Sequence, residues 1–231
     1  MGLGGRWQTV KEAYRKIAEV YERANKIVTF GQVDKWRREA LRLFYALDGR
    51  SNTKVLDVGA GPGNMARHLR GLNYVVALDI TIEMLSLNNL ADDRVVGDFE
   101  HMPFRDASFD LLIAGYSLHA ARDLERAVAE FNRVAHIHVV VSIGNPDNRI
   151  VRSIIHIYTK YIMPRLVCIL APKEICSEYS KIYLILSSTM SNSQLRQIVS
   201  KYADVLRFVE KAFGSVYIYV SRARRGSQIA I

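Results

Sequence analysis

The chain has 231 residues and a formal net charge of +9, and 49% of its residues are hydrophobic while 24% are charged. This composition is typical of an ordinary folded protein and excludes a disordered, collagen-like or disulfide-stapled chain. No uncharged apolar stretch of about 18 residues occurs, so we expect no membrane-spanning helix. Two cysteines are too few for a disulfide framework or a cysteine-based zinc site, which predicts no bound metal and a reducing, cytoplasmic environment.

Charge is unevenly distributed along the sequence. Residues 1–50 carry a net charge of +5, residues 51–148 carry −5, and residues 149–231 carry +9. This asymmetry fits basic flanks that face phospholipid or nucleic acid, and an acidic centre that faces a ligand with positive charge. A solvated basic surface would give the same totals, so both interpretations stay open here.

Apolar residues recur at helical spacing in the N-terminal part and predict two helices, over 10–28 and 36–47. From residue 54 on, short apolar runs alternate with helical patterns, which predicts a parallel sheet with helices on both faces. The predicted strands are 54–58, 75–78, 94–96, 111–114 and 137–143, and the predicted helices between them lie near 65–69, 82–90 and 123–134.

Beyond residue 148 the pattern changes. It predicts an apolar, basic helix over 150–161, a helix near 192–202, and two strands over 205–210 and 216–222. Phe213 and Gly214 separate the two strands, which is typical of an antiparallel hairpin. We expect this hairpin to close one edge of the sheet.

The first predicted strand runs directly into a loop that contains Gly59, Gly61 and Gly63. Glycine permits a sharp turn and lets a ligand approach the backbone. A dinucleotide-binding G-x-G-x-x-G motif would require glycine where Asn64 stands, so an NAD site is disfavoured. Asp57 would fit poorly beside a pyrophosphate but well beside an ammonium or sulfonium group, which points to S-adenosylmethionine.

Two further carboxylates follow the next two strands. Asp79 ends the second strand, where a carboxylate can accept hydrogen bonds from both hydroxyls of a ribose. Asp98 follows the third strand, and with Phe99 it would suit an adenine held by its amine and packed on its ring face. Each acid alone is more often a surface residue or a helix cap. Their joint position behind a glycine loop favours a nucleoside site.

Three segments resemble motifs of the class I S-adenosylmethionine-dependent methyltransferases, and within them the ubiquinone/menaquinone biosynthesis C-methyltransferases. VLDVGAGPGN resembles the first motif of that family, ALDIT the second, and GDFEHMPFRDASFDLL its GNAExLPFxDxSFD segment. The similarity extends to the flanks, at 21–25, 32–41, 158–170 and 183–188.

The resemblance implies a Rossmann-like α/β fold with a mostly parallel seven-stranded sheet and an antiparallel edge strand. It implies a single methyltransferase domain with an N-terminal helical cap at 1–50, a cofactor-binding core at 51–148, and a substrate-cap helix with a C-terminal hairpin at 149–231. The implied cofactor-binding residues are Asp57, Gly59, Gly61, Gly63, Asp79, Ile80, Asp98, Phe99 and Gly115.

The sequence departs from the family after the fourth strand, where GLRN is replaced by SLHA, so His119 stands where an arginine is usual. Ionising a quinol hydroxyl with a phenol-like pKa of about 10 costs roughly 4 kcal/mol at pH 7, so a base would help. His119 is the candidate base. The resemblance implies that Tyr116, with Gly115, lies under the reactive sulfonium. A pocket-wall role for His119 stays open. The AGYS sequence at 114–117 disfavours methylation of exocyclic amines.

We therefore expect a methyltransferase that C-methylates a demethylmenaquinol-like ring and releases S-adenosylhomocysteine. Alternatives are another small molecule, a lipid or RNA as acceptor, or a non-catalytic nucleic-acid-binding module of the same fold. Steep salt dependence would identify RNA binding. The basic helix at 150–161 is expected to contact an anionic membrane surface, and its alternatives are a core-packing cap or a homodimer interface.

Overall fold

The structure is a computed structural model, and it describes residues 29, 31–47, 53–170 and 189–224. The helix predicted over 10–28 lies outside the described residues, as do the segments 21–25 and 183–188. The division of the chain into cap, core and substrate-cap segments therefore stays a prediction.

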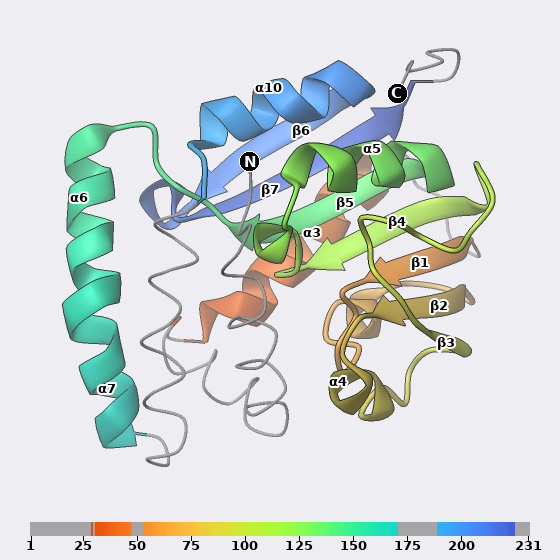
Figure 1. Cartoon of the computed structure of the whole chain (residues 1–231), viewed down its shortest axis with the longest axis horizontal. Coiled ribbons are helices and arrows are strands. Elements are labelled where there is room, and N and C mark those ends of the chain that lie inside the picture. Colours follow the sequence, from red (N-terminus) through yellow and green to blue (C-terminus); the bar gives the residue numbers. More distant parts are fainter. Residues whose placement is uncertain (1–28, 30, 48–52, 171–188, 225–231) are drawn as a thin grey trace.

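A seven-stranded sheet forms the centre of the molecule, in the order β3-β2-β1-β4-β5-β7-β6 (Figure 1). The first five strands pair in parallel, whereas β7 is antiparallel to both β5 and β6. The predicted fold class is confirmed, and the hairpin closes one edge with β6 outermost. The strands are β1 Lys54–Val58, β2 Tyr74–Asp79, β3 Asp93–Val96, β4 Phe109–Gly115, β5 Ala135–Ile143, β6 Ala203–Lys211 and β7 Val216–Ala223.

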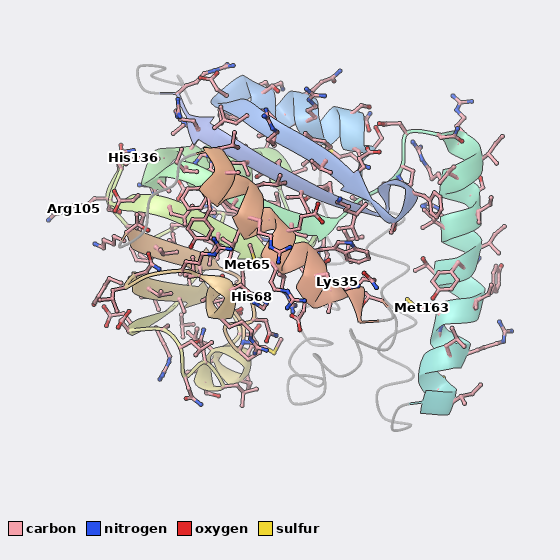
Figure 2. The ribbon with its side chains drawn as sticks, turned by 180° about the vertical axis from the view of Figure 1, so that it is seen from behind. Lys35, Met65, His68, Arg105, His136 and Met163 are labelled. Carbon is pink, nitrogen blue, oxygen red and sulfur yellow. The ribbon has the colours of Figure 1, made fainter. Side chains whose placement is uncertain are left out.

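Helices cover both faces of the sheet. Helices α5 (Leu124–Val134) and α10 (Asn192–Tyr202) pack on one face, and α3 (Gln32–Leu47) packs on the other, as Figures 1 and 2 show from opposite sides. Each presents an apolar stripe at helical spacing to the sheet. Two apolar cores result, one under each layer, and the buried parallel strands separate them.

Two helices are shorter than the sequence predicts. The segment 82–90 is helical only over α4 (Ile82–Ser86), because the buried Asn88 side chain accepts hydrogen bonds from the amides of Leu90 and Ala91 and closes the turn. The segment 65–69 forms only the short η2 turn, Ala66–His68, with hydrogen bonds of the tighter 3₁₀ type.

A helical column follows β5. It consists of α6 (Arg149–Ile157), a π-helical turn η4 (Tyr158–Ile162) and α7 (Met163–Leu170). Among the described residues no helix is both long and apolar enough to cross a membrane. Cys168 in α7 is disulfide-bonded.

The central position of β4 gives a stability prediction. Leu112 lies between β1 and β5 with no exposed surface, whereas Leu72 is 88% exposed. Replacing Leu112 by alanine should lower the free energy of unfolding by about 2–5 kcal/mol, because the substitution leaves a cavity in a packed core. The matched change Leu72→Ala should alter it by less than about 0.5 kcal/mol. Urea denaturation measures both, and equal effects would contradict the described packing.

Candidate active site

A cavity opens where β1 and β4 end, at the point where the strand order reverses. In open parallel sheets this is the place where ligands bind, because neighbouring loops diverge there. The cavity is lined by Arg37, Asp57, Gly59, Ala60, Gly61, Pro62, Asn64, Met65, Asp79, Ile80, Thr81, Met84, Phe99, Gly115, Tyr116, Ser117 and Ala120.

The glycine loop after β1 wraps closely around its neighbours. A Cβ at Gly59 would lie 2.3 Å from the Cβ of Ser117, whose hydroxyl donates to the carbonyl of Val58. A Cβ at Gly63 would lie 2.8 Å from Oδ1 of Asn88. Gly59 thus allows β1 and β4 to meet at the cavity floor, and Gly63 supports the packing behind it without lining the cavity.

The carboxylate of Asp57 is strongly perturbed by its position in the cavity. Its residue is 1% exposed, and burial raises its pKa to about 8. Arg37 and the nearby amide of Ala66 oppose that rise, but neither carboxylate oxygen has a partner with hydrogen-bond geometry among the described residues. A positively charged group bound in the cavity would stabilise a buried carboxylate in this state.

Asp79 lies at the end of β2 and is held in a fixed orientation. Its two carboxylate oxygens accept hydrogen bonds of 2.8 Å from the amides of Gly61 and Thr81. Burial raises its pKa, while those two amides and that of Ile80 oppose the rise. The carboxylate therefore lines the cavity in a preset position, with acceptor capacity left for a ligand.

Arg37 is a cavity residue that sequence reasoning did not single out. It is buried in α3, donates to Asp34 at 2.9 Å, and places its guanidinium 5.4 Å from the ring centre of Tyr116. The signal was present in the sequence, because Arg37 interrupts the apolar stripe formed by Val33, Leu41 and their neighbours. A cation on the buried face of an amphipathic helix indicates a polar site beneath it.

Tyr116 follows β4 with a backbone φ of +62°, in the left-handed region that side chains other than glycine rarely adopt. Its amide donates to the carbonyl of Val141 at 2.7 Å, which holds the turn in place. The conformation places the residue in the cavity wall next to Gly115. Strained backbone of this kind occurs often at functional sites.

Of the two residues expected to bind adenine, Phe99 lines the cavity and Asp98 does not. Phe99 lines the cavity and packs edge to face against Phe131, with ring centres 6.3 Å apart. The carboxylate of Asp98 is not part of the lining, since it pairs with the Arg122 guanidinium and accepts from the amide of Glu100. Its proposed contact with adenine would have to compete with Arg122.

His119 lies behind the cavity wall rather than in the cavity lining. Its Nδ1 is 2.9 Å from the hydroxyl of Ser142, and burial lowers its pKa to about 4. The imidazole is therefore neutral at pH 7, and holding a proton there is costly. This geometry suits a residue that positions the turn after β4.

Residues 56–141 match the family model for a methyltransferase domain. The chain carries a methyltransferase domain of the class that uses S-adenosylmethionine. A demethylmenaquinone methyltransferase of Thermotoga maritima is 33% identical over 141 residues, which cover 57% of this chain and 59% of that protein. One of Staphylococcus aureus is 26% identical over 170 residues, which cover 68% of this chain and 69% of that protein. This chain thus matches less than two thirds of the first relative's length.

The fold has close counterparts among solved structures. An S-adenosylmethionine-dependent methyltransferase of Thermotoga maritima, described as a possible histamine N-methyltransferase, superposes with a TM-score of 0.60. The superposition covers 93% of this chain and all of that one, at 13% sequence identity. This likeness establishes the fold.

The donor set of the methyltransferase domain fits S-adenosylmethionine, the cofactor that this family and fold imply. The cofactor carries an ammonium and a sulfonium group, and Asp57 is a buried carboxylate whose surroundings leave it short of positive charge. Its ribose hydroxyls are donors, and Asp79 is an oriented acceptor in the same cavity.

Cofactor affinity should depend on pH through Asp57. Below pH 8 its carboxyl is largely protonated in the free protein, and a cationic ligand favours the ionised form, so binding should release a proton. Affinity for S-adenosylmethionine should therefore rise with pH, by up to about tenfold per unit, and level off near pH 8. Calorimetry in buffers of different ionisation enthalpy measures the proton released.

Asp57→Asn is the control for this measurement and should remove the proton release. S-adenosylhomocysteine keeps the ammonium group but lacks the sulfonium. Proton release on its binding would show that Asp57 contacts the ammonium, and no release would show that it contacts the sulfonium. Equal pH dependence in the wild type and Asp57→Asn would contradict the assignment.

Replacing Asp79 by alanine should weaken cofactor binding by about 1.5–3 kcal/mol, the scale of hydrogen bonds to a charged group. Asp79→Asn keeps one acceptor oxygen and should lose less. Asp106→Ala removes a carboxylate that is 79% exposed and is the control. Titration calorimetry gives the affinities, thermal melting confirms folding, and an unchanged affinity in Asp79→Ala would refute the ribose assignment.

Proposed function

We propose that this protein transfers a methyl group from S-adenosylmethionine to a ring carbon of a demethylated quinol of the demethylmenaquinol type. The methyl-transfer part of the proposal rests on the buried Asp57 carboxylate, which would be stabilised by a cationic ligand and lies in the same cavity as the oriented Asp79. The quinol part is supported by two relatives that are named demethylmenaquinone methyltransferases.

The proposed cofactor contacts divide between the two sides of the cavity. Asp57 would bind the positively charged methionine end, and the Arg37 guanidinium on α3 would attract its carboxylate. Asp79 would hold the ribose, and Phe99 would pack against the adenine ring. Gly59, Gly61, Ile80 and Gly115 would shape the floor and walls. S-adenosylmethionine, when bound, supplies an already activated methyl group.

With the methyl group already activated, the protein has to align the acceptor and exclude water. Tyr116, held by its backbone hydrogen bond to Val141, is proposed to form the wall against which the quinol ring rests. The Arg37 guanidinium lies over the Tyr116 ring, and its positive charge would also favour the deprotonated form of a quinol hydroxyl bound there.

The role of His119 as a base stays a prediction, and its burial makes that role costly. With the pKa of His119 at about 4, transfer of a proton to it from a phenol of pKa about 10 would cost roughly 8 kcal/mol of free energy. Release of the same proton to water at pH 7 costs roughly 4 kcal/mol. We therefore propose that His119 acts through its contact with Ser142 and orients the turn that carries Tyr116.

The proposal predicts methylation of a quinol and not of RNA. Purified protein would be incubated with S-adenosylmethionine and detergent-solubilised, chemically reduced demethylmenaquinone, with bulk RNA in a parallel reaction. Mass spectrometry should show the gain of one methylene unit on the quinol only. Asp79→Ala should lose most of the product at limiting cofactor, and Leu72→Ala should keep it.

Methylated RNA, together with RNA binding that weakens steeply as salt rises, would refute the quinol as acceptor and identify a nucleic acid in its place. Product on neither acceptor, in protein that still binds the cofactor, would refute the proposed acceptor and leave the methyltransferase domain in place. Absence of cofactor binding would refute both.

A further inference from the structure

The helical column of α6, η4 and α7 exposes an apolar stripe. The stripe consists of Ile150, Ile154, Ile157 and Tyr161, whose spacing of four, three and four residues places them on one side of a helix. Their exposed fractions are 73%, 60%, 55% and 48%. Single exposed apolar residues are common, but four in a continuous row mark a surface that contacts another apolar phase.

A different side of the column, which includes the buried Thr159 and Met163, faces the rest of the protein. Arg152 donates to the carbonyl of Pro146 at 2.7 Å, and Thr159 is buried. Met163 is also buried, and Figure 2 shows it pointing from the column toward the other elements. Within the described part of the chain, the apolar stripe is therefore not the packing face of the column.

The charge around the stripe discriminates between possible occupants. Residues 149–170 include four basic side chains and no acidic one. Arg149, Lys160 and Arg165 are exposed, and Lys160 lies 5.1 Å from the ring centre of Tyr161. A second copy of this face, related by twofold symmetry, would bring these like charges together. An anionic lipid surface is complementary to both the apolar stripe and the charges.

We propose that the apolar stripe of this column docks the protein on an anionic lipid bilayer. The column stands on the side of the molecule toward which β1 and β4 point, which is the side where the cavity opens (Figure 1). Docking there would bring the cavity close to a membrane-borne acceptor. This last consequence rests on the proposed function, whereas the docking itself does not.

Vesicle flotation tests the proposal with the full chain. Wild type should bind vesicles of phosphatidylcholine and phosphatidylglycerol, bind pure phosphatidylcholine weakly, and dissociate as salt rises. The double change Ile154→Gln with Ile157→Gln should weaken partitioning by about tenfold or more, because two aliphatic side chains that would insert into the bilayer on docking are lost. Arg149→Gln with Lys160→Gln should reduce the preference for anionic lipid by about tenfold or more, because two of the three exposed basic side chains are lost.

Matched controls come from elsewhere on the surface. Leu72→Gln with Leu90→Gln replaces two apolar side chains that are 88% and 50% exposed, and Arg105→Gln with Arg207→Gln removes two exposed charges. Both controls should bind vesicles like the wild type. All variants occupy exposed positions, so calorimetric affinity for S-adenosylmethionine should stay unchanged.

Equal vesicle binding by the stripe variant and wild type would overturn the proposal. So would a dimer in solution that the stripe variant loses while neither protein binds vesicles, since the stripe would then be an interface between copies. Methylation of a quinol with a short, water-soluble side chain should be the same in wild type and stripe variant. If neither the wild type nor the stripe variant methylates this quinol, the proposed acceptor is refuted, while the vesicle-binding result still decides the docking proposal.

Discussion

The carboxylate of Asp57 has lost nearly all of its water at the end of β1, and its raised pKa reflects how poorly the protein replaces that water. A folded protein tolerates such a group when a ligand supplies the missing positive charge. Its position is imposed by the sheet, because β1 pairs with β2 on one side and β4 on the other. The sheet thus fixes a buried carboxylate at the end of β1, where, within the described part of the chain, only a ligand can supply a positive charge in direct contact with it.

The elements around Asp57 are arranged so that a ligand can reach it. Gly59 lets the chain turn within contact distance of Ser117, and Tyr116 adopts a left-handed backbone at the end of the neighbouring strand. Asp79 is tied to the glycine loop by the amide of Gly61, so the two carboxylates keep a fixed relation. The cavity is preorganised by backbone hydrogen bonds, which lowers the ordering cost of binding.

Charge separates the two ends of the proposed reaction path. The core carries the acidic groups that attract a cationic cofactor, whereas the column after β5 carries only basic ones beside its apolar stripe. The asymmetry seen along the sequence therefore corresponds to a spatial division in the fold.

Much of the fold follows from local pattern. The strands around residues 54–58, 75–78 and 137–143 are mostly apolar because they are largely buried on both faces, and such runs can be recognised without a structure. The helix predicted over 82–90 was too long, because the side chain of Asn88 competes for the backbone amides and a periodic apolar pattern does not reveal that competition. The hairpin order, with β7 inside β6, also depends on pairing between segments distant in the chain.

By itself, the sequence determined the alternation of strands and helices, the glycine loop, and the placement of Asp57, Asp79 and Phe99 at strand ends, because these are periodic or short-range features. Only the tertiary structure decided which of these groups share a cavity. It brought Arg37 from α3 into the site, drew Asp98 toward Arg122, and buried His119 against Ser142. Burial and charge pairing depend on which distant segments pack together, and the desolvation that sets a pKa exists only after they have done so.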